Sequence, residues 1–381
     1  MPDNARDSTD SRRTLSMTAV LMRLVVIGVV ALGVAALFAY AGGWLSPHRL
    51  TQARIIAAFG QLDGIHPGFR RNHAKGICAT GWFESNGQAA SLSKAALFAP
   101  GKVPVVGRIA FAGGMPFIPD EPDTVRSLAL RFLPAGGDEW RTGMINIPVF
   151  PFATVQAFYE QMVASKPDPA TGQPDPAKMQ AFAANHPEFV AAIDIVKKRL
   201  VSSGFADATY NSLNTFRFVN SDGVSTPVRW SAVSLQPFVA AATAATAVPA
   251  SADGASADKN ALFDALIADV AKHPVQWRLV ITAGQAGDPT ANPTLPWPAD
   301  RKQIDAGTVT IDKVSSEDDG PCVDVNFDPM VLPAGIEASD DPIPSARSAA
   351  YARSFTLREG ERKVKPPSAV TPQEVSSVGK S

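Results

Sequence analysis

The sequence has few of the residues that build metal clusters, disulfide frameworks or nucleic-acid surfaces. Its 381 residues include two cysteines and five histidines. Cys78 and Cys322 lie far apart and form no CxxC pair, which excludes a zinc motif or a dense disulfide framework but leaves open one disulfide or two buried thiols. The net charge is -1 and there is no long basic run. A nucleic-acid partner is therefore not expected, since phosphate binding needs a clustered basic surface.

The sequence does contain one long uncharged segment, which runs from Leu24 to Leu45. An apolar helix needs about 20 residues to cross a bilayer core. Arginines at positions 12, 13 and 23 precede the segment, and Tyr40 and Trp44 stand near its far end, where amphipathic rings favour the membrane interface. This pattern predicts a single-pass inner-membrane protein with a cytoplasmic tail (1–23), an anchor (24–45) and a periplasmic domain.

A cleaved export signal is the alternative interpretation of this segment. The letters SRRTLS, from Ser11, form a loose twin-arginine pattern, and Ala39–Ala41 offers a cleavage site. The apolar run is longer than the 7–15 residues usual for a signal core, which favours the anchor. With cleavage, the protein is expected to be soluble in the periplasm.

Strand patterns dominate the rest of the chain. Leu128, Leu130 and Phe132 alternate with other residues in SLALRF, and four further segments share this period: TFRFV, VRWSAVSL, VQWRLVI and TVTIDKV. Helical spacing occurs in LTQARIIAAFGQL, ATVQAFYEQMVASK and HPEFVAAIDIVKKRL. Because no βαβ alternation is visible, we expect an α+β fold with an antiparallel sheet or barrel and flanking helices.

Three segments are expected to lie outside this core. The letters KPDPATGQPDPAK predict a stiff loop, and VAAATAATAVPASADGASAD is of low complexity and predicts a surface insertion. The C-terminal stretch 361–381 lacks apolar periodicity and predicts a disordered tail. The folded domain is therefore expected over 46–360.

Two places have side chains suited to chemistry. After Pro342 and Pro344, a predicted helix places Arg347, Tyr351 and Arg358 on one face, at about 100° per residue. A guanidinium one turn from a phenol stabilises the phenolate, although a surface helix with solvated arginines has the same spacing. The second place is His73, which on its own is more often a packed or solvated residue than a catalytic one.

Taken together, five ordered blocks between Leu50 and Arg358 resemble the haem catalase superfamily, and most of all its shorter catalase-related peroxidases. The blocks are RxxHAKG from Arg70, NxPVF from Asn146, NTFRFVNSDG from Asn214, FDPMVLPAGIEASDDPI from Phe327 and RxxxY from Arg347. The resemblance implies a catalase-like antiparallel β-barrel that binds haem b.

The resemblance also implies roles for individual residues. His73 would be the distal histidine that moves the proton of a bound peroxide, and Tyr351 would be the proximal iron ligand, kept as phenolate by Arg347. Phe150 would line the distal pocket. The haem propionates would be held by Arg70, Arg108 and Arg358.

Several positions depart from the pattern of full catalases. The distal asparagine is replaced by Ile145, with Asn146 one residue later as the candidate second polar partner of the peroxide. The serine that supports the distal histidine is replaced by Ala110, and the apolar residue before the histidine by Asn72. The histidine associated with NADPH in the SHTF block is missing from SLNTF, so NADPH is not predicted.

These departures predict a haem peroxidase that reduces hydrogen peroxide or organic hydroperoxides with an unknown small organic electron donor, and with weak or absent catalase activity. An oligomer is possible. Three alternatives remain open: a fatty-acid hydroperoxide lyase or isomerase of the same superfamily, a non-catalytic haem sensor or carrier, and an exported binding protein without haem, which a Soret band would exclude. Product analysis with a lipid hydroperoxide distinguishes the lyase or isomerase from the predicted peroxidase. The response of the haem spectrum to peroxide distinguishes the sensor or carrier from it.

Overall fold

The computed structural model describes residues 16–42, 45, 50–136, 138–241 and 259–380. The chain divides into two compact units, Met1–Thr51 and Gln52–Ser381. The expected tail up to residue 15, Trp44 and most of the low-complexity segment (242–258) lie outside the described residues.

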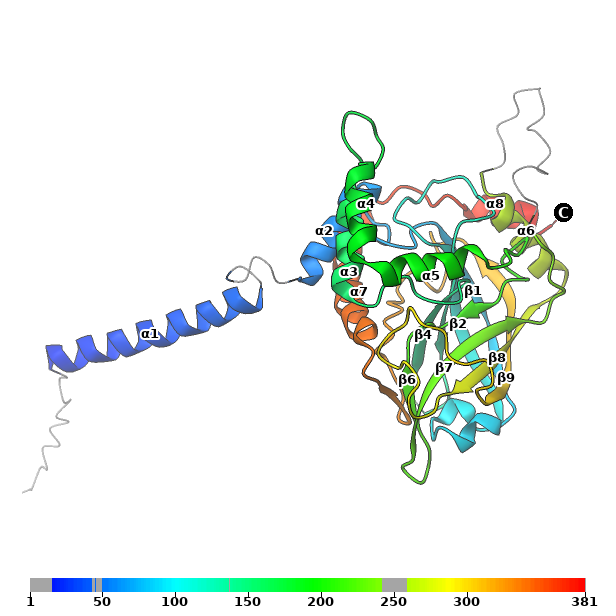
Figure 1. Cartoon of the computed structure of the whole chain (residues 1–381), viewed down its shortest axis with the longest axis horizontal. Coiled ribbons are helices and arrows are strands. Elements are labelled where there is room, and N and C mark those ends of the chain that lie inside the picture. Colours follow the sequence, from blue (N-terminus) through cyan, green and yellow to red (C-terminus); the bar gives the residue numbers. More distant parts are fainter. Residues whose placement is uncertain (1–15, 43–44, 46–49, 137, 242–258, 381) are drawn as a thin grey trace, which may run out of the picture. The chain divides into compact units, whose positions relative to one another are not determined.

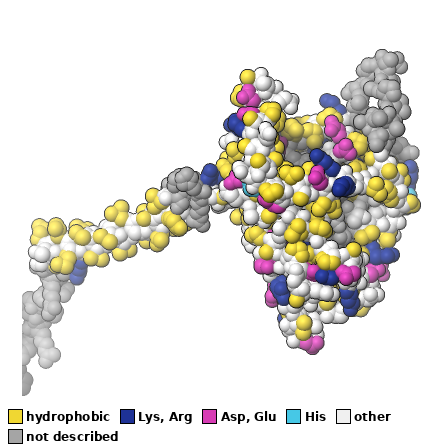
Figure 2. Space-filling model, viewed as in Figure 1, with side chains coloured by type: hydrophobic (Ala, Val, Ile, Leu, Met, Phe, Trp, Pro, Cys, Tyr) yellow, Lys and Arg dark blue, Asp and Glu magenta, His cyan; other side chains and the backbone are white. Residues whose placement is uncertain are grey.

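The first unit contains one described helix, α1 (Met17–Ala41), which begins earlier than the expected anchor. Ser16 caps it, since its hydroxyl accepts a hydrogen bond from the Ala19 amide. Figure 2 shows hydrophobic side chains along the whole length of α1. Its length and mean hydropathy of 2.6 are sufficient for a membrane span or an export signal.

The second unit is built on an antiparallel sheet that closes into a barrel, which confirms the expected fold class. The sheet order is β10-β6-β7-β5-β4-β3-β2-β1-β9-β8, and an additional β7–β8 pairing closes the ring of eight strands from β7 to β8. Its strands are β1 (Gly76–Ser85), β2 (Gly101–Phe111), β3 (Arg126–Phe132), β4 (Trp140–Ile145), β5 (Tyr210–Asn211), β6 (Phe216–Val219), β7 (Ser225–Ser234), β8 (Val275–Ala283), β9 (Gln303–Ser315) and β10 (Ile336–Ala338).

Aromatic side chains fill the barrel interior because alternate residues of each strand point inward. Trp140 is fully buried, stacks on Phe132 at a centroid distance of 5.0 Å and meets Trp230 edge-on at 4.9 Å. Each such ring contributes roughly 1.5–3 kcal/mol through burial. A β-bulge beside Gly81 requires glycine, since a Cβ there would lie 1.9 Å from the Thr310 carbonyl oxygen.

Helices cover the outside of this barrel in two groups (Figure 1). One group is formed by α2 (Gln52–Asp63), α3 (Val155–Ala164) and α7 (Pro342–Glu361), which contact one another, with α4 (Pro176–Asn185) and α5 (Pro187–Lys197) following α3. In the other, α6 (Ala261–Lys272) and α8 (Pro372–Val378) pack against each other and against β9. Three short 3-10 turns complete the fold: η1 (Gln88–Ser91), η2 (Ala96–Phe98) and η3 (Arg362–Val364).

The expected disordered tail over 361–381 is wrong for its described part. Val370 is completely buried in the core, and α8 begins with a capping box in which Thr371 and Glu374 bond each other's backbone amides. The segment is ordered because one apolar anchor and one cap suffice to hold a short helix against α6. The folded unit therefore extends past residue 360.

Candidate active site

A single cavity between the barrel wall and helices α2, α3 and α7 collects nearly all the predicted site residues. Those that line it are Arg70, His73, Arg108, Phe150, Arg347, Tyr351 and Arg358. Its apolar side comes from Ile55 and Phe59 of α2 and from Phe158 of α3. The histidine and the tyrosine, which are far apart in the sequence, thus face one space.

The turn that enters β1 fixes the position of His73. Its φ of 56° is left-handed, a conformation that is uncommon for residues other than glycine. Here the Asn72 Oδ1 accepts hydrogen bonds from the His73 and Gly113 amides, both at 2.9 Å. Asn72 therefore stabilises the turn, a role that an apolar residue at this position does not provide.

A backbone carbonyl sets the tautomer of His73. The ring Nδ1 donates to the Phe111 carbonyl oxygen at 3.1 Å, and because a carbonyl only accepts, Nε2 is left with a free lone pair. Phe111 follows Ala110, the position of the missing serine. The backbone carbonyl of Phe111 thus holds the imidazole, one residue after the position where the supporting serine was expected.

His73 is neutral over the physiological pH range. Burial and the positive charges of Arg108 and Arg347 lower the pKa of its imidazole to about 3. A neutral ring with a free Nε2 is a proton acceptor, which is the state that a general base requires.

In the same cavity, α7 presents Tyr351 and Arg347 one turn apart. The Arg347 Nη2 donates to the Tyr351 hydroxyl oxygen at 3.4 Å, and its Nη1 donates to the Asn214 Oδ1 at 3.0 Å. The guanidinium also lies against Gly143, where a Cβ would be 3.1 Å from Nη2. These contacts hold a positive charge beside the phenol oxygen.

Asn214 connects this pair to the start of α7. Its Nδ2 donates to the Asp341 Oδ2 at 3.0 Å, and Asp341 caps α7 by accepting from the Ile343 amide. Asn214 belonged to one of the sequence blocks, but its contacts with Arg347 and Asp341 were not predicted. The signal that was available is an Asp-Pro helix start six residues before Arg347.

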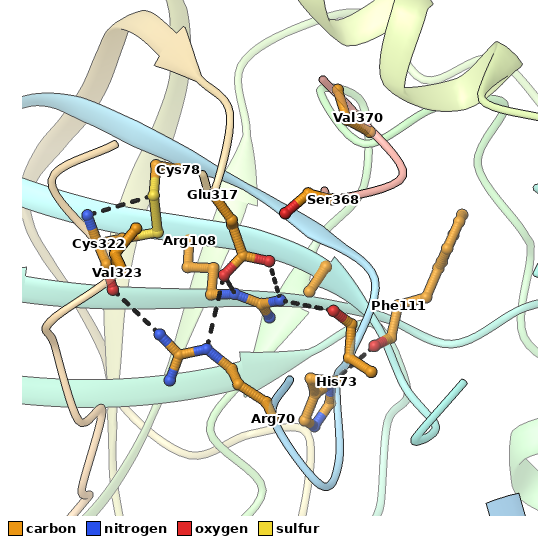
Figure 3. A network of polar contacts seen from close by, with 12 residues as sticks. Arg70, His73, Cys78, Arg108, Phe111, Glu317, Cys322, Val323, Ser368 and Val370 are labelled. Atoms are coloured by element: carbon orange, nitrogen blue, oxygen red, sulfur yellow. Dashed lines mark hydrogen bonds and ion pairs between the residues drawn. A yellow bond between two sulfur atoms is a disulfide. The ribbon is translucent and has the colours of Figure 1, made fainter. Parts of the chain in front are cut away.

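Three arginines form a buried cluster at the edge of the cavity around Glu317, which sequence reasoning missed. The Arg108 Nε and Nη2 donate to the Glu317 carboxylate at 2.7 and 2.6 Å, and the Arg70 Nε lies 3.6 Å from it (Figure 3). Burial and the neighbouring Arg108 and Arg358 lower the pKa of Arg70 to about 9. Burial alone would raise the pKa of Glu317, but the arginines lower it to about 2.

Two guanidinium groups of this cluster have donors that an anionic ligand would satisfy. The Arg70 Nε and the Arg358 Nη2 are buried without a hydrogen-bond partner, which is costly unless a ligand completes them. Three guanidinium charges against one carboxylate leave two positive charges. Two carboxylates of one ligand would balance them, so the cluster, the phenol and the apolar walls together fit a haem with its two propionates.

Asn146 does not take the position that was predicted for it. Its Oδ1 accepts from the Arg126 amide at 2.7 Å, outside the residues that line the cavity, whereas Ile145 does line it. Successive residues at the end of β4 point to opposite sides, so a shift by one position turns the amide away. The expectation that Asn146 contacts a bound peroxide is therefore wrong.

Comparisons with known proteins identify the family of the chain. The sequence model of the family described as Catalase matches residues 55–376. The chain is 36% identical over 309 residues to a catalase-related peroxidase of Synechococcus elongatus, covering 81% of this chain and 89% of that one. It is 28% identical to a catalase-related peroxidase of Mycolicibacterium paratuberculosis over 82% of this chain and 96% of that one.

Solved structures show the same fold. A bacterial catalase superposes with a TM-score of 0.65 at 22% identity, covering 81% of this chain and 60% of the catalase. A fungal catalase superposes with a TM-score of 0.67 at 18% identity, covering 78% and 60%. The chain therefore spans about three fifths of the length of these catalases.

Proposed function

This chain belongs to the catalase family, and on that basis we propose that it is a haem-dependent peroxidase. The observation that supports this most is the shared cavity, which is lined by both a neutral imidazole and an arginine-paired phenol. The reaction reduces a peroxide to water, or to water and an alcohol, with two electrons and two protons.

The residues of the cavity fit a haem in the following way. Tyr351 would hold the iron, as tyrosine does in catalase, and Arg347 would stabilise the negative charge of the phenolate. Arg70, Arg108 and Arg358 would bind the propionates. When bound, the haem supplies an iron that accepts peroxide and exchanges electrons.

His73 moves the proton. Its Nε2 takes the proton from the peroxide oxygen and returns it to the leaving oxygen, while Nδ1 stays bonded to the Phe111 carbonyl. Ile145 occupies the position of the expected amide, so no side chain at that position orients the peroxide through a hydrogen bond. We infer that a second peroxide is a poor reductant here and that a small organic donor supplies the electrons.

Kinetics of the purified, haem-loaded chain test this assignment. We expect oxidation of a phenolic donor by hydrogen peroxide or cumene hydroperoxide to exceed oxygen evolution from hydrogen peroxide. Oxygen evolution that far outpaces donor oxidation would instead assign the protein as a catalase. Release of rearranged or cleaved lipid products without donor consumption would assign it as a hydroperoxide isomerase or lyase.

For localisation, we propose that α1 anchors the protein in the inner membrane with the barrel in the periplasm. The arginines before α1 support this orientation, and the disulfide between Cys78 and Cys322 is typical of an oxidising compartment. Resistance of the protein to extraction by alkaline carbonate supports the anchor, and full release into the periplasmic fraction supports cleavage.

A further inference from the structure

One loop orients all three arginines of the cluster. This segment, 316–327, is called the anchor loop here. Its Cys322 and Val325 carbonyl oxygens accept from the Arg70 Nη2 at 3.0 and 3.1 Å, and its Val323 carbonyl accepts from the Arg358 Nη1 at 2.5 Å. Its Glu317 holds Arg108 through two hydrogen bonds. The guanidinium directions thus depend on where this loop lies.

The disulfide fastens the anchor loop to the barrel wall next to one of these arginines. Cys78, on β1, is paired with Cys322, and Cys78 is the strand partner of Arg108 on β2. Both cysteines are fully buried, and the Cys322 amide points at the Cys78 sulfur at 3.2 Å. The approach is so close that a Cβ on Gly320 would lie 2.8 Å from the Cys78 Cβ.

Other contacts keep the start of the loop in place without the disulfide. The Asp318 carboxylate accepts from the Lys365 Nζ at 2.7 Å and from the Ser368 amide, and the Ser316 hydroxyl donates to the Val370 carbonyl oxygen at 2.7 Å. The part near residues 322–325, which contacts Arg70 and Arg358, is attached by the disulfide together with the buried Val325 side chain and an ion pair between Asp324 and Arg362. Loss of the cross-link should therefore loosen the arginine-holding part while the barrel stays folded.

We propose that the anchor loop, locked by the Cys78–Cys322 disulfide, is the positioning element of the arginine cluster, with Glu317 as its charged positioning residue. The disulfide form then retains a dianionic ligand more strongly than the dithiol form. This inference rests on the proposed function, since haem is the dianionic ligand used to test it.

Hemin retention by the full-length chain in detergent is the first test, with the wild type compared with the Cys78→Ala/Cys322→Ala double variant. We expect hemin to leave the variant for an excess of apomyoglobin about tenfold faster, which corresponds to about 1.4 kcal/mol. Equal rates in the two proteins would overturn the proposal. Failure of both to bind hemin would refute the proposed function.

Hydrogen exchange of the ligand-free proteins tests the inference independently of hemin. In the double variant, the amides of residues 320–327 should exchange faster, while the β3 and β4 amides exchange as in the wild type. Unchanged exchange in the anchor loop would contradict a positioning role for the disulfide. Faster exchange throughout the barrel would also contradict it, because it would show a general loss of stability.

Thermal unfolding with and without hemin tests Glu317. Glu317→Gln adds one positive charge in both states, from two to three in the ligand-free cluster and from zero to one in the loaded cluster. Repulsion within the cluster grows with its net charge, so the added charge costs more in the ligand-free protein. The variant should therefore lower the melting temperature of the ligand-free protein more than that of the loaded protein, and Glu317→Asp should restore part of the difference. Equal losses in both states would show a merely structural role.

Asp288→Asn is the matched control for Glu317→Gln. Asp288 is also a carboxylate with little exposed side-chain surface that bonds an arginine, Arg301, at 2.8 Å, but it lies outside the cavity lining. Its removal should lower both melting temperatures by the same amount.

Discussion

At the scale of single residues, the site depends on His73 being held in an unusual backbone conformation and kept neutral. The Asn72 side chain stabilises the left-handed turn, and the Phe111 carbonyl selects the tautomer. The block around His73 predicted the residue but not these partners. Asn72 was visible in the sequence only as a departure from the family pattern, and the Phe111 carbonyl is a backbone group that leaves no side-chain signal.

His73→Gln should lower kcat/KM for peroxide by about 10²–10⁴, the range typical of a lost general acid–base catalyst. Hemin binding should change little, since the histidine is not among the groups proposed to hold the haem. His186→Gln is the control, because His186 bonds Glu160 and Glu188 away from the cavity lining. Full activity in the His73 variant would remove the proposed base.

The pH profile follows from the low pKa of His73, about 3. Only the neutral ring accepts a proton, so its contribution to kcat/KM should be constant from pH 8 down to about pH 5 and should fall only as the pH approaches 3. Steady-state rates over this pH range in the wild type and in His73→Gln measure the contribution of His73 to kcat/KM. A fall in kcat/KM with a midpoint near pH 6.5 that is present in the wild type and absent from the variant would contradict the lowered pKa of His73.

At the scale of secondary-structure elements, α7 was the most predictable part of the site. Helical spacing placed Arg347, Tyr351 and Arg358 on one face, and all three line the cavity. The strand β4 shows the opposite case, because its last residues alternate sides and a shift of one position misplaced Asn146. Helix α8 was missed since seven residues are too few to show a periodicity.

Asn214→Ala tests the link between α7 and the barrel. The change leaves the Arg347 Nη1 without its acceptor and removes one of the donors to Asp341, which keeps the Thr215 and Ile343 amides, and this should cost about 1–3 kcal/mol of unfolding free energy. Urea unfolding measures this loss. The loaded protein should also show a shifted visible spectrum, because the guanidinium beside the phenol is no longer fixed.

Asn211→Ala is the control for that variant. Asn211 donates to the Ile147 carbonyl and accepts from the Ser231 hydroxyl, and it is outside the cavity lining. It should lose stability without a spectral shift. A spectral shift in both variants, or in neither, would argue against a specific link from Asn214 to Tyr351.

At the scale of the whole molecule, closure of the barrel brings together segments that the sequence separates by hundreds of residues. Strand alternation predicted the fold class, and the family resemblance predicted seven of the residues that line the cavity. Neither could assign Glu317 to Arg108 or choose between a disulfide and two thiols. Such pairings depend on loop paths, which have no periodic pattern to read.

The two compact units predict that the barrel is independent of the apolar helix. A chain that begins at Leu50 should fold, bind hemin as the full chain does and remain in the supernatant after ultracentrifugation without detergent. The full chain should sediment with membranes if α1 is retained. A shortened chain that unfolds or fails to bind hemin would show that residues before 50 belong to the folded unit.

The account rests on Tyr351 facing the cavity that His73 also lines, as the axial ligand of a haem. Its most direct test is the absorption spectrum of the purified, hemin-loaded protein, measured side by side for the wild type and Tyr351→Phe. We expect a Soret band in the wild type with tyrosinate features at longer wavelengths, and loss of those features in the variant. Identical spectra for the two proteins would contradict the account.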